Sequence, residues 1–128
     1  MILFVCVHNA GRSVMAEAFA RAAGLDAISA GTEPSGHVHP EVVEAMSELG
    51  FDVAGHEGVL LTSAMVERAA RVITMGCAVD SAVCPAILYA NKEDWGLDDP
   101  KGKPQEDVRK IRDEVRARVE TLAVEVKA

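Results

Sequence analysis

The first 24 residues read as a strand, a short loop and a helix, and this unit restricts the possible folds more than any other part of the chain. Residues 2–5 are an uninterrupted apolar run, which is typical of a strand buried on both faces of a sheet. Residues 13–23 are rich in alanine and predict a helix that stops at Gly24. Strands buried on both faces belong to parallel sheets covered by helices, so we expect an α/β fold.

The remaining chain repeats this alternation of strands and helices. Apolar runs predict four parallel strands, at residues 2–7, 27–30, 71–75 and 86–89. Further helices are predicted at residues 40–49, 62–70 and 104–126. The last of them is amphipathic and is expected to pack one face on the sheet. Because no linker or repeat interrupts the pattern, we expect one domain over residues 1–128.

The loop between the first strand and the first helix carries the residues that can do chemistry. It reads Cys6-Val7-His8-Asn9-Ala10-Gly11-Arg12-Ser13, a cysteine and five further residues followed by arginine and serine. Ligands of parallel sheets bind beyond the carboxyl ends of the strands, where this loop lies. Its backbone N–H groups and the helix dipole attract anions and favour the thiolate of Cys6, which is the nucleophilic form. We therefore predict a site in which Cys6 attacks a tetrahedral oxyanion.

The neighbours of Cys6 have expected roles in that site. Arg12 offers a fork of donors that fits two oxygens of a phosphate-like anion. Asn9 tolerates left-handed backbone dihedrals and organises the loop, and Gly11 permits a sharp bend beside the anion. Ser13 caps the helix and can donate a hydrogen bond to the Cys6 sulfur. The predicted anion-binding residues are Asn9, Ala10, Gly11, Arg12 and Ser13.

Charge and composition argue against several classes of binding partner. The formal net charge of −7 argues against nucleic acid or an anionic membrane as a partner. No apolar run approaches the ~20 residues that a membrane-spanning helix needs, and the N-terminus lacks the basic start of a cleaved signal peptide. An odd number of cysteines, three, suits a reducing cytoplasm and reactive thiols better than a set of structural disulfides.

The second and third cysteines follow the third predicted strand. Six residues separate Cys77 from Cys84, more than the spacing usual for a zinc pair. In one continuous helix their Cα atoms would be ~10.5 Å apart, whereas a disulfide needs about 7 Å or less. A bond between Cys77 and Cys84 therefore requires their segment to rearrange, and Gly76 and Pro85 are suitable ends for such a segment. The alternative is a pair of buried apolar cysteines.

The loop from Cys6 to Ser13 resembles the active-site loop of the low-molecular-weight protein tyrosine phosphatases, and equally that of the arsenate reductases built on the same scaffold. The resemblance implies a three-layer sandwich, with helices on both faces of a four-stranded parallel sheet of flavodoxin-like winding. Cys77 and Cys84-Pro85 match the paired cysteines of the thioredoxin-coupled reductases. Residues 95–100 (Trp-Gly-Leu-Asp-Asp-Pro) are similar to their acid loop, and the tyrosine pair typical of the phosphatases is missing, since Tyr89 is the only tyrosine.

The resemblance implies reduction of arsenate to arsenite, a step in arsenic detoxification. Cys6 attacks arsenic while Asp99, as general acid, protonates the departing hydroxyl. Cys77 then attacks the Cys6 adduct and releases arsenite, Cys84 attacks Cys77, and thioredoxin reduces the resulting Cys77–Cys84 disulfide. The thiols carry the electrons, so no flavin or metal is implied. We expect a monomer with arsenate as substrate and with phosphate or sulfate as mimics.

Alternative interpretations stay open at this point. Cys6 can be a buried strand-end cysteine, Arg12 a surface helix residue and Asp99 a plain turn aspartate. The protein can be a phosphatase that hydrolyses phosphomonoesters through a Cys6 phosphoenzyme, with no need of Cys77 or Cys84. It can also be a non-catalytic oxyanion or thiol sensor, or an arsenate reductase whose Cys6 is resolved by a low-molecular-weight thiol.

Overall fold

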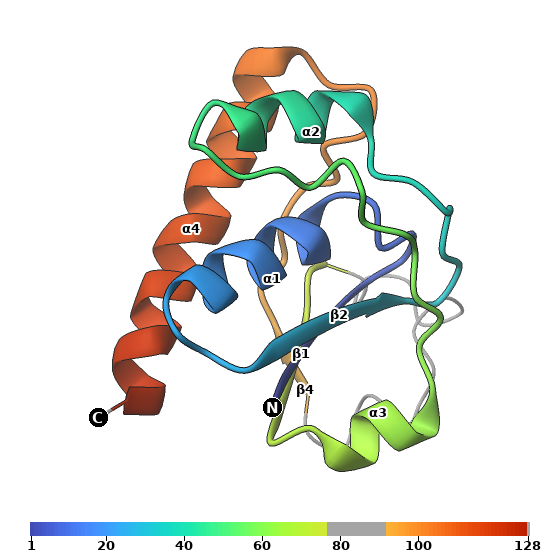
Figure 1. The fold of residues 1–128 in the computed structure, drawn as a ribbon, viewed down its shortest axis with the longest axis vertical. Helices are drawn as coiled ribbons and strands as arrows, with labels where there is room; N and C mark the ends of the chain where they lie inside the picture. The colour runs from blue at the N-terminus through green and yellow to red at the C-terminus, as the bar shows by residue number, and fades with distance from the viewer. Residues whose placement is uncertain (77–91, 128) are drawn as a thin grey trace.

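The computed structural model describes residues 1–76 and 92–127 and contains a four-stranded parallel sheet between helical layers (Figure 1). The order of the strands is β2-β1-β3-β4, with every neighbouring pair parallel. They are β1 (Ile2–Cys6), β2 (Ala27–Gly31), β3 (Arg71–Thr74) and β4 (Lys92–Asp94). The predicted α/β fold with flavodoxin-like winding is therefore confirmed. Three predicted strands agree with the structure to within one residue at each end.

The fourth strand differs from the prediction. The apolar run at residues 86–89 lies outside the described residues, and the strand that pairs with β3 is the charged triplet of β4. Among residues 1–76 and 92–127, β4 has a partner on one side only, and charged side chains are common on such edge strands. A search for apolar runs therefore passes over this segment.

Helices cover both faces of the sheet. The helices are α1 (Arg12–Ala22), α2 (Pro40–Ser47), α3 (Ser63–Arg68) and α4 (Gln105–Lys127). In Figure 1, α1, α2 and α4 lie on one side of the sheet and α3 lies on the other. The predicted helical segments all exist, and α2 and α3 are shorter than expected. In the described residues, no helix has both the length and the apolar composition to cross a membrane.

β1 is the centre of both hydrophobic cores. All five of its residues are buried, as the uninterrupted apolar run predicted. Because strand side chains alternate between faces, Phe4 and Cys6 pack into the core beneath α1, α2 and α4. Leu3 and Val5 pack into the smaller core with Val66 of α3. This double burial fixes the strand whose last residue is Cys6.

Arg71 joins the start of β3 to the sheet edge and to α4. Its guanidinium pairs with Glu93 at 2.5 Å and with Glu125 at 3.2 Å. Burial alone would raise the pKa of Glu93, but hydrogen bonds from Arg71 and from the indole of Trp95 outweigh it and hold the pKa below its ordinary value. The edge strand is thus stabilised by charge rather than by apolar packing alone.

Replacing Arg71 by Gln should lower the free energy of unfolding by about 1 kcal/mol at pH 7, a modest loss because the three side chains are partly exposed. A lowered carboxylate pKa stabilises the fold above the unfolded pKa of about 4.3. The difference between wild type and Arg71→Gln should therefore shrink as the pH falls below that value. Urea unfolding from pH 7 to pH 3 measures it, with the exposed Arg68→Gln as control. A loss that is independent of pH would contradict the assignment.

Candidate functional site

The predicted anion loop occupies the carboxyl edge of the sheet. Cys6 is the last residue of β1, and α1 begins at Arg12 with Gly11 as its N-cap. β2 lies on one side of β1 and β3 on the other, so the loop lies where the chain changes direction across the sheet. The expectation that Ser13 caps the helix is wrong, because the helix starts before it and Ser13 lies in the first turn. That position directs its hydroxyl to Cys6 instead.

A short chain of hydrogen bonds ends at the Cys6 sulfur. The Oγ of Ser13 lies 2.9 Å from the Sγ of Cys6, and the side-chain amide of Asn9 donates to the same Oγ at 2.8 Å. Since Ser13 accepts the hydrogen bond from Asn9, its own hydroxyl proton is available to the sulfur. A donated hydrogen bond stabilises a thiolate more than a thiol. The predicted contact between Ser13 and Cys6 is therefore present.

Asn9 holds the loop to a distant segment. It is buried and has a φ of 49°, the left-handed conformation that its residue type tolerates. Its Oδ1 accepts the backbone N–H of Val59 at 3.0 Å and contacts the Nε2 of His56 at 2.9 Å. Because a backbone N–H can only donate, Oδ1 is the acceptor and His56 must carry its proton on Nε2. Sequence patterns gave His56 no role, since its partner lies 47 residues away.

Arg12 is built into the site rather than lying on the surface. The residue is 8% exposed, and its Nη1 donates to the carbonyls of Met75 at 2.8 Å and Leu97 at 2.9 Å. Its Nη2 is 4.0 Å from the Oδ2 of Asp99. One side of the guanidinium thus anchors the loops after β3 and β4, and the other side is near the predicted acid. The surface alternative for Arg12 is wrong.

Two glycines let neighbouring segments approach the loop. A Cβ on Gly31 would be 2.7 Å from the carbonyl oxygen of Val7 and 2.9 Å from the backbone nitrogen of Asn9. A Cβ on Gly76, whose φ is +124°, would be 2.7 Å from the Nη1 of Arg12. A side chain at either position would therefore displace the atoms that it contacts. Both glycines are positioning residues. The sequence patterns did not identify Gly31 and gave Gly76 only as a segment end, because the close contacts of both depend on other segments.

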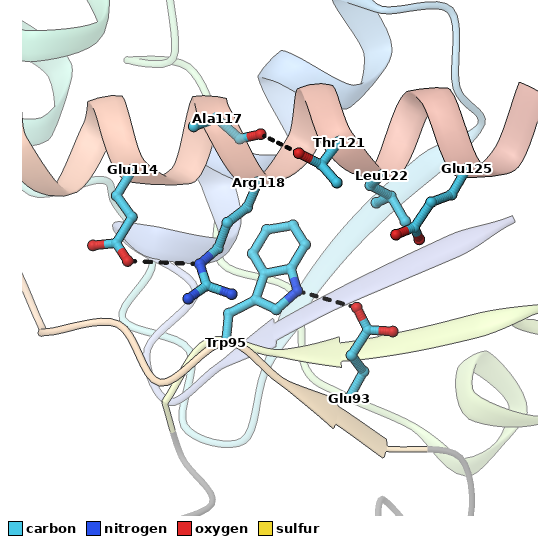
Figure 2. Close-up of a pocket in the computed structure, with 8 residues that line it drawn as sticks. All are labelled: Glu93, Trp95, Glu114, Ala117, Arg118, Thr121, Leu122 and Glu125. Carbon is cyan, nitrogen blue, oxygen red and sulfur yellow. Dashed lines mark hydrogen bonds and ion pairs between the residues drawn. The ribbon is translucent and has the colours of Figure 1, made fainter.

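The segment after β4 is anchored by Trp95. This residue is 7% exposed, its indole donates to Glu93 at 3.1 Å, and the guanidinium of Arg118 lies 5.9 Å from its ring centre. Figure 2 shows the indole between β4 and α4, beside the guanidinium of Arg118. The indole lines a groove of about 450 Å³. Leu97 is also buried, so the acid loop is fixed on its apolar side. Asp99 follows with its side chain 48% exposed and its Oδ1 accepting the N–H of Lys101 at 3.0 Å.

A small cavity unites most of the predicted site. It is lined by Cys6, His8, Ala10, Gly11, Arg12, His39 and Asp99. The structure therefore brings together the predicted nucleophile, the anion-binding arginine and the predicted acid. Cys77 and Cys84 lie outside the described residues. Among residues 1–76 and 92–127, no group of three or more His, Cys, Asp or Glu side chains is placed to hold a metal ion.

The close approach of Gly31 to Val7 and Asn9 can be used to test whether Gly31 stabilises the conformation of the anion loop. Gly31→Ala should push the backbone of Val7 and Asn9 out of place, lower the free energy of unfolding by about 1–3 kcal/mol and weaken anion binding. Gly55→Ala is the control, since a Cβ there meets nothing within 4 Å. Urea unfolding and protection of the Cys6 thiol by phosphate measure the two effects. Equal behaviour of the two variants would show that Gly31 does not support the loop.

Comparisons with known proteins agree with this geometry. Residues 1–128 match the family model of the low molecular weight phosphotyrosine protein phosphatases. A putative arsenate reductase of Halobacterium salinarum is 39% identical over 127 residues, covering 93% of this chain and 87% of that protein. An arsenate reductase of Staphylococcus aureus is 37% identical over 125 residues, 94% of each chain.

Solved structures of similar proteins have the same fold. One described as an arsenate reductase in the phosphate-binding state has a TM-score of 0.83 and 35% identity, covering 97% of this chain and 96% of the other. The YwlE arginine phosphatase of Geobacillus stearothermophilus has a TM-score of 0.84 and 25% identity, with coverages of 98% and 92%. The chain therefore belongs to the low molecular weight phosphotyrosine protein phosphatase family, whose scaffold it shares with arsenate reductases.

Proposed function

We propose that this protein reduces arsenate to arsenite at the cavity lined by Cys6, Arg12 and Asp99. The observation that carries the proposal is this cavity, in which a thiol, a buried guanidinium and a carboxylic acid meet. Relatives named arsenate reductase, 37–39% identical over almost the whole chain, support arsenate as the oxyanion. The related structure in the phosphate-binding state supports binding of a tetrahedral anion at this loop.

The anion is held by the loop amides of residues 10–13 and by Arg12. Because carbonyl groups of Met75 and Leu97 hold Nη1, the guanidinium has a fixed direction before the anion arrives. Such preorganisation avoids the entropic cost of ordering a free arginine side chain on binding. Arsenate and phosphate have the same shape and charge, so both enter.

Chemistry begins at Cys6. Its thiolate attacks arsenic, a sulfur–arsenic bond forms, and one arsenic–oxygen bond breaks. The departing hydroxide takes a proton from Asp99 and leaves as water. The hydrogen bond from Ser13 stabilises the thiolate before the attack. The product is a Cys6–arsenic(V) adduct.

Electrons then come from the thiols. Cys77 attacks the Cys6 sulfur, a disulfide forms, and the electron pair of the sulfur–arsenic bond reduces arsenic to arsenite. Gly76, which precedes Cys77 in the sequence, lies against Arg12, and this favours Cys77 as the first resolving thiol. Cys84 then attacks Cys77 and frees Cys6. Thioredoxin reduces the Cys77–Cys84 disulfide, which suits a reducing compartment, the cytoplasm. The proposal needs only one copy of the chain, a monomer.

Phosphomonoester hydrolysis is the second candidate, favoured by the family model and by the likeness to an arginine phosphatase. It uses the same Cys6, Arg12 and Asp99, and water rather than a thiol resolves the Cys6 adduct. The two activities share the first chemical step and differ in the second. Experiments on the second step therefore separate them.

The cysteine relay is tested by arsenate-dependent NADPH consumption with thioredoxin and thioredoxin reductase. Steady-state turnover should fall to background in Cys6→Ser, Cys77→Ser and Cys84→Ser. In a single turnover without reductant, Cys84→Ser should still release about one arsenite per protein, since its Cys6 and Cys77 remain. Cys77→Ser should release none.

Hydrolysis of p-nitrophenyl phosphate is the internal control for these variants. Cys77→Ser and Cys84→Ser should keep whatever hydrolytic rate the wild type has, because Cys6 is intact, whereas Cys6→Ser should lose it. Normal arsenate turnover in Cys77→Ser or Cys84→Ser would refute the relay. Rapid hydrolysis without arsenate reduction would favour the phosphatase.

Asp99→Asn should slow the first chemical step by about 100-fold or more, since the amide has the same shape and no proton to donate. Its Oδ1 can still accept the N–H of Lys101, so the loop should keep its conformation. Asp98→Asn, at the adjacent exposed carboxylate, is the matched control. Single-turnover formation of the Cys6 adduct measures the effect. Equal rates for the two variants would make Asp99 a plain turn residue.

A further inference from the structure

His39 lies in the wall of the cavity, although no sequence pattern assigned it a function. Its backbone is held from both sides. Its N–H donates to the carbonyl of Ala10 at 2.9 Å, and its own carbonyl accepts the N–H groups of Val42 and Val43 at 3.0 Å each. His39 is the N-cap of α2, so the first turn of that helix positions the residue against the anion loop.

The imidazole ring packs closely on the loop. A Cβ placed on Gly11 would be 3.5 Å from the Cδ2 of His39 and 3.1 Å from the Cγ of Pro100. Both side chains therefore lie against the backbone of Gly11. The side chain of His39 also lines the cavity that contains Cys6.

The acid loop and α2 are also tied to each other. The side-chain amide of Gln105 donates to the carbonyl of Glu41 at 3.0 Å, and the N–H of Gly102 donates to the Glu41 carboxylate at 3.3 Å. These bonds fix the position of Asp99-Pro100 relative to His39. A general acid must lie within hydrogen-bond reach of the leaving oxygen, so the leaving group faces Asp99. His39 lines the cavity together with Asp99, so a substituent on that oxygen meets the His39 side chain.

We propose that His39 is a specificity-determining residue, whose ring closes the leaving-group side of the cavity to aryl esters while inorganic oxyanions enter. This inference rests on the proposed function of the cavity and adds to it the residue that selects the substrate class. The lining contains no phenylalanine, tyrosine or tryptophan among the described residues, so it lacks a large apolar ring against which an aryl group would pack.

The pKa of His39 supports a steric rather than an electrostatic role for its ring. Burial lowers the pKa of His39 below its ordinary value of 6.5. The carboxylates of Glu41 and Asp99 raise the pKa, Lys101 and His8 lower it, and the balance stays downward. The ring is thus neutral near pH 7 and adds no charge that would attract an anion. Removing it should therefore enlarge the site without weakening the cradle.

Protection of Cys6 from iodoacetamide tests the proposal. The experiment uses a Cys77→Ser, Cys84→Ser background, in which Cys6 is the one thiol. Inorganic phosphate and phenylphosphonate are the probes, because both bind as tetrahedral anions and neither can be hydrolysed. Their half-protecting concentrations give apparent affinities for the cavity. The readout needs no arsenate reduction, so it remains interpretable if the relay assay fails.

Wild type should be protected by phosphate at a lower concentration than by phenylphosphonate. His39→Ala should lower the half-protecting concentration of phenylphosphonate by about 10-fold and change that of phosphate by about 2-fold at most. His39→Leu keeps a neutral, bulky side chain without adding an aromatic face and should keep the discrimination. His37→Ala, at the exposed histidine of the same loop, is the control and should behave as wild type.

Three results would overturn the proposal. One is a wild type that binds both anions equally. Another is an equal change for both anions in His39→Ala, which would indicate a disturbed loop instead of an opened wall. The third is loss of discrimination in His39→Leu. Should His39→Ala fail to fold, the comparison of wild type with His39→Leu still decides the matter.

Discussion

The arrangement of the site depends on the hydrogen bonds that the guanidinium of Arg12 donates. A single buried side chain from the start of α1 binds the carbonyl of Met75 after β3 and that of Leu97 after β4, and it is near Asp99. Three segments that are distant in sequence are thereby held around one cation. The cost of burying its charge is offset by these hydrogen bonds and by the negative ligand that the cavity is shaped to receive.

Local sequence was informative wherever the local backbone decides the structure. The apolar run of β1, the helix after it and the left-handed Asn9 could all be predicted from short-range rules. Gly31, His56 and His39 could not, because each acts through a segment that is remote in sequence. β4 was missed for another reason: its charged residues pair as a strand only because β3 offers an edge.

The residues of the site also differ in how far they are exposed to solvent. Cys6 is 3% exposed and Asn9 is fully buried, whereas the side chain of Asp99 is 48% exposed. The proposed nucleophile and its hydrogen-bond partners are therefore held inside the protein. The proposed acid, Asp99, lines the cavity with its carboxylate open to solvent.

The carboxylate of Asp94 has a consequence for the segment that carries the other two cysteines. It accepts the hydroxyl of Thr74 at 2.6 Å and the N–H of Gly76 at 3.0 Å, so the end of β4 is tied to the point where the chain leaves β3. The proposed cysteine relay begins one residue beyond this hydrogen-bonded anchor. A change of redox state at Cys77 is therefore expected to leave the pairing of β3 with β4 intact.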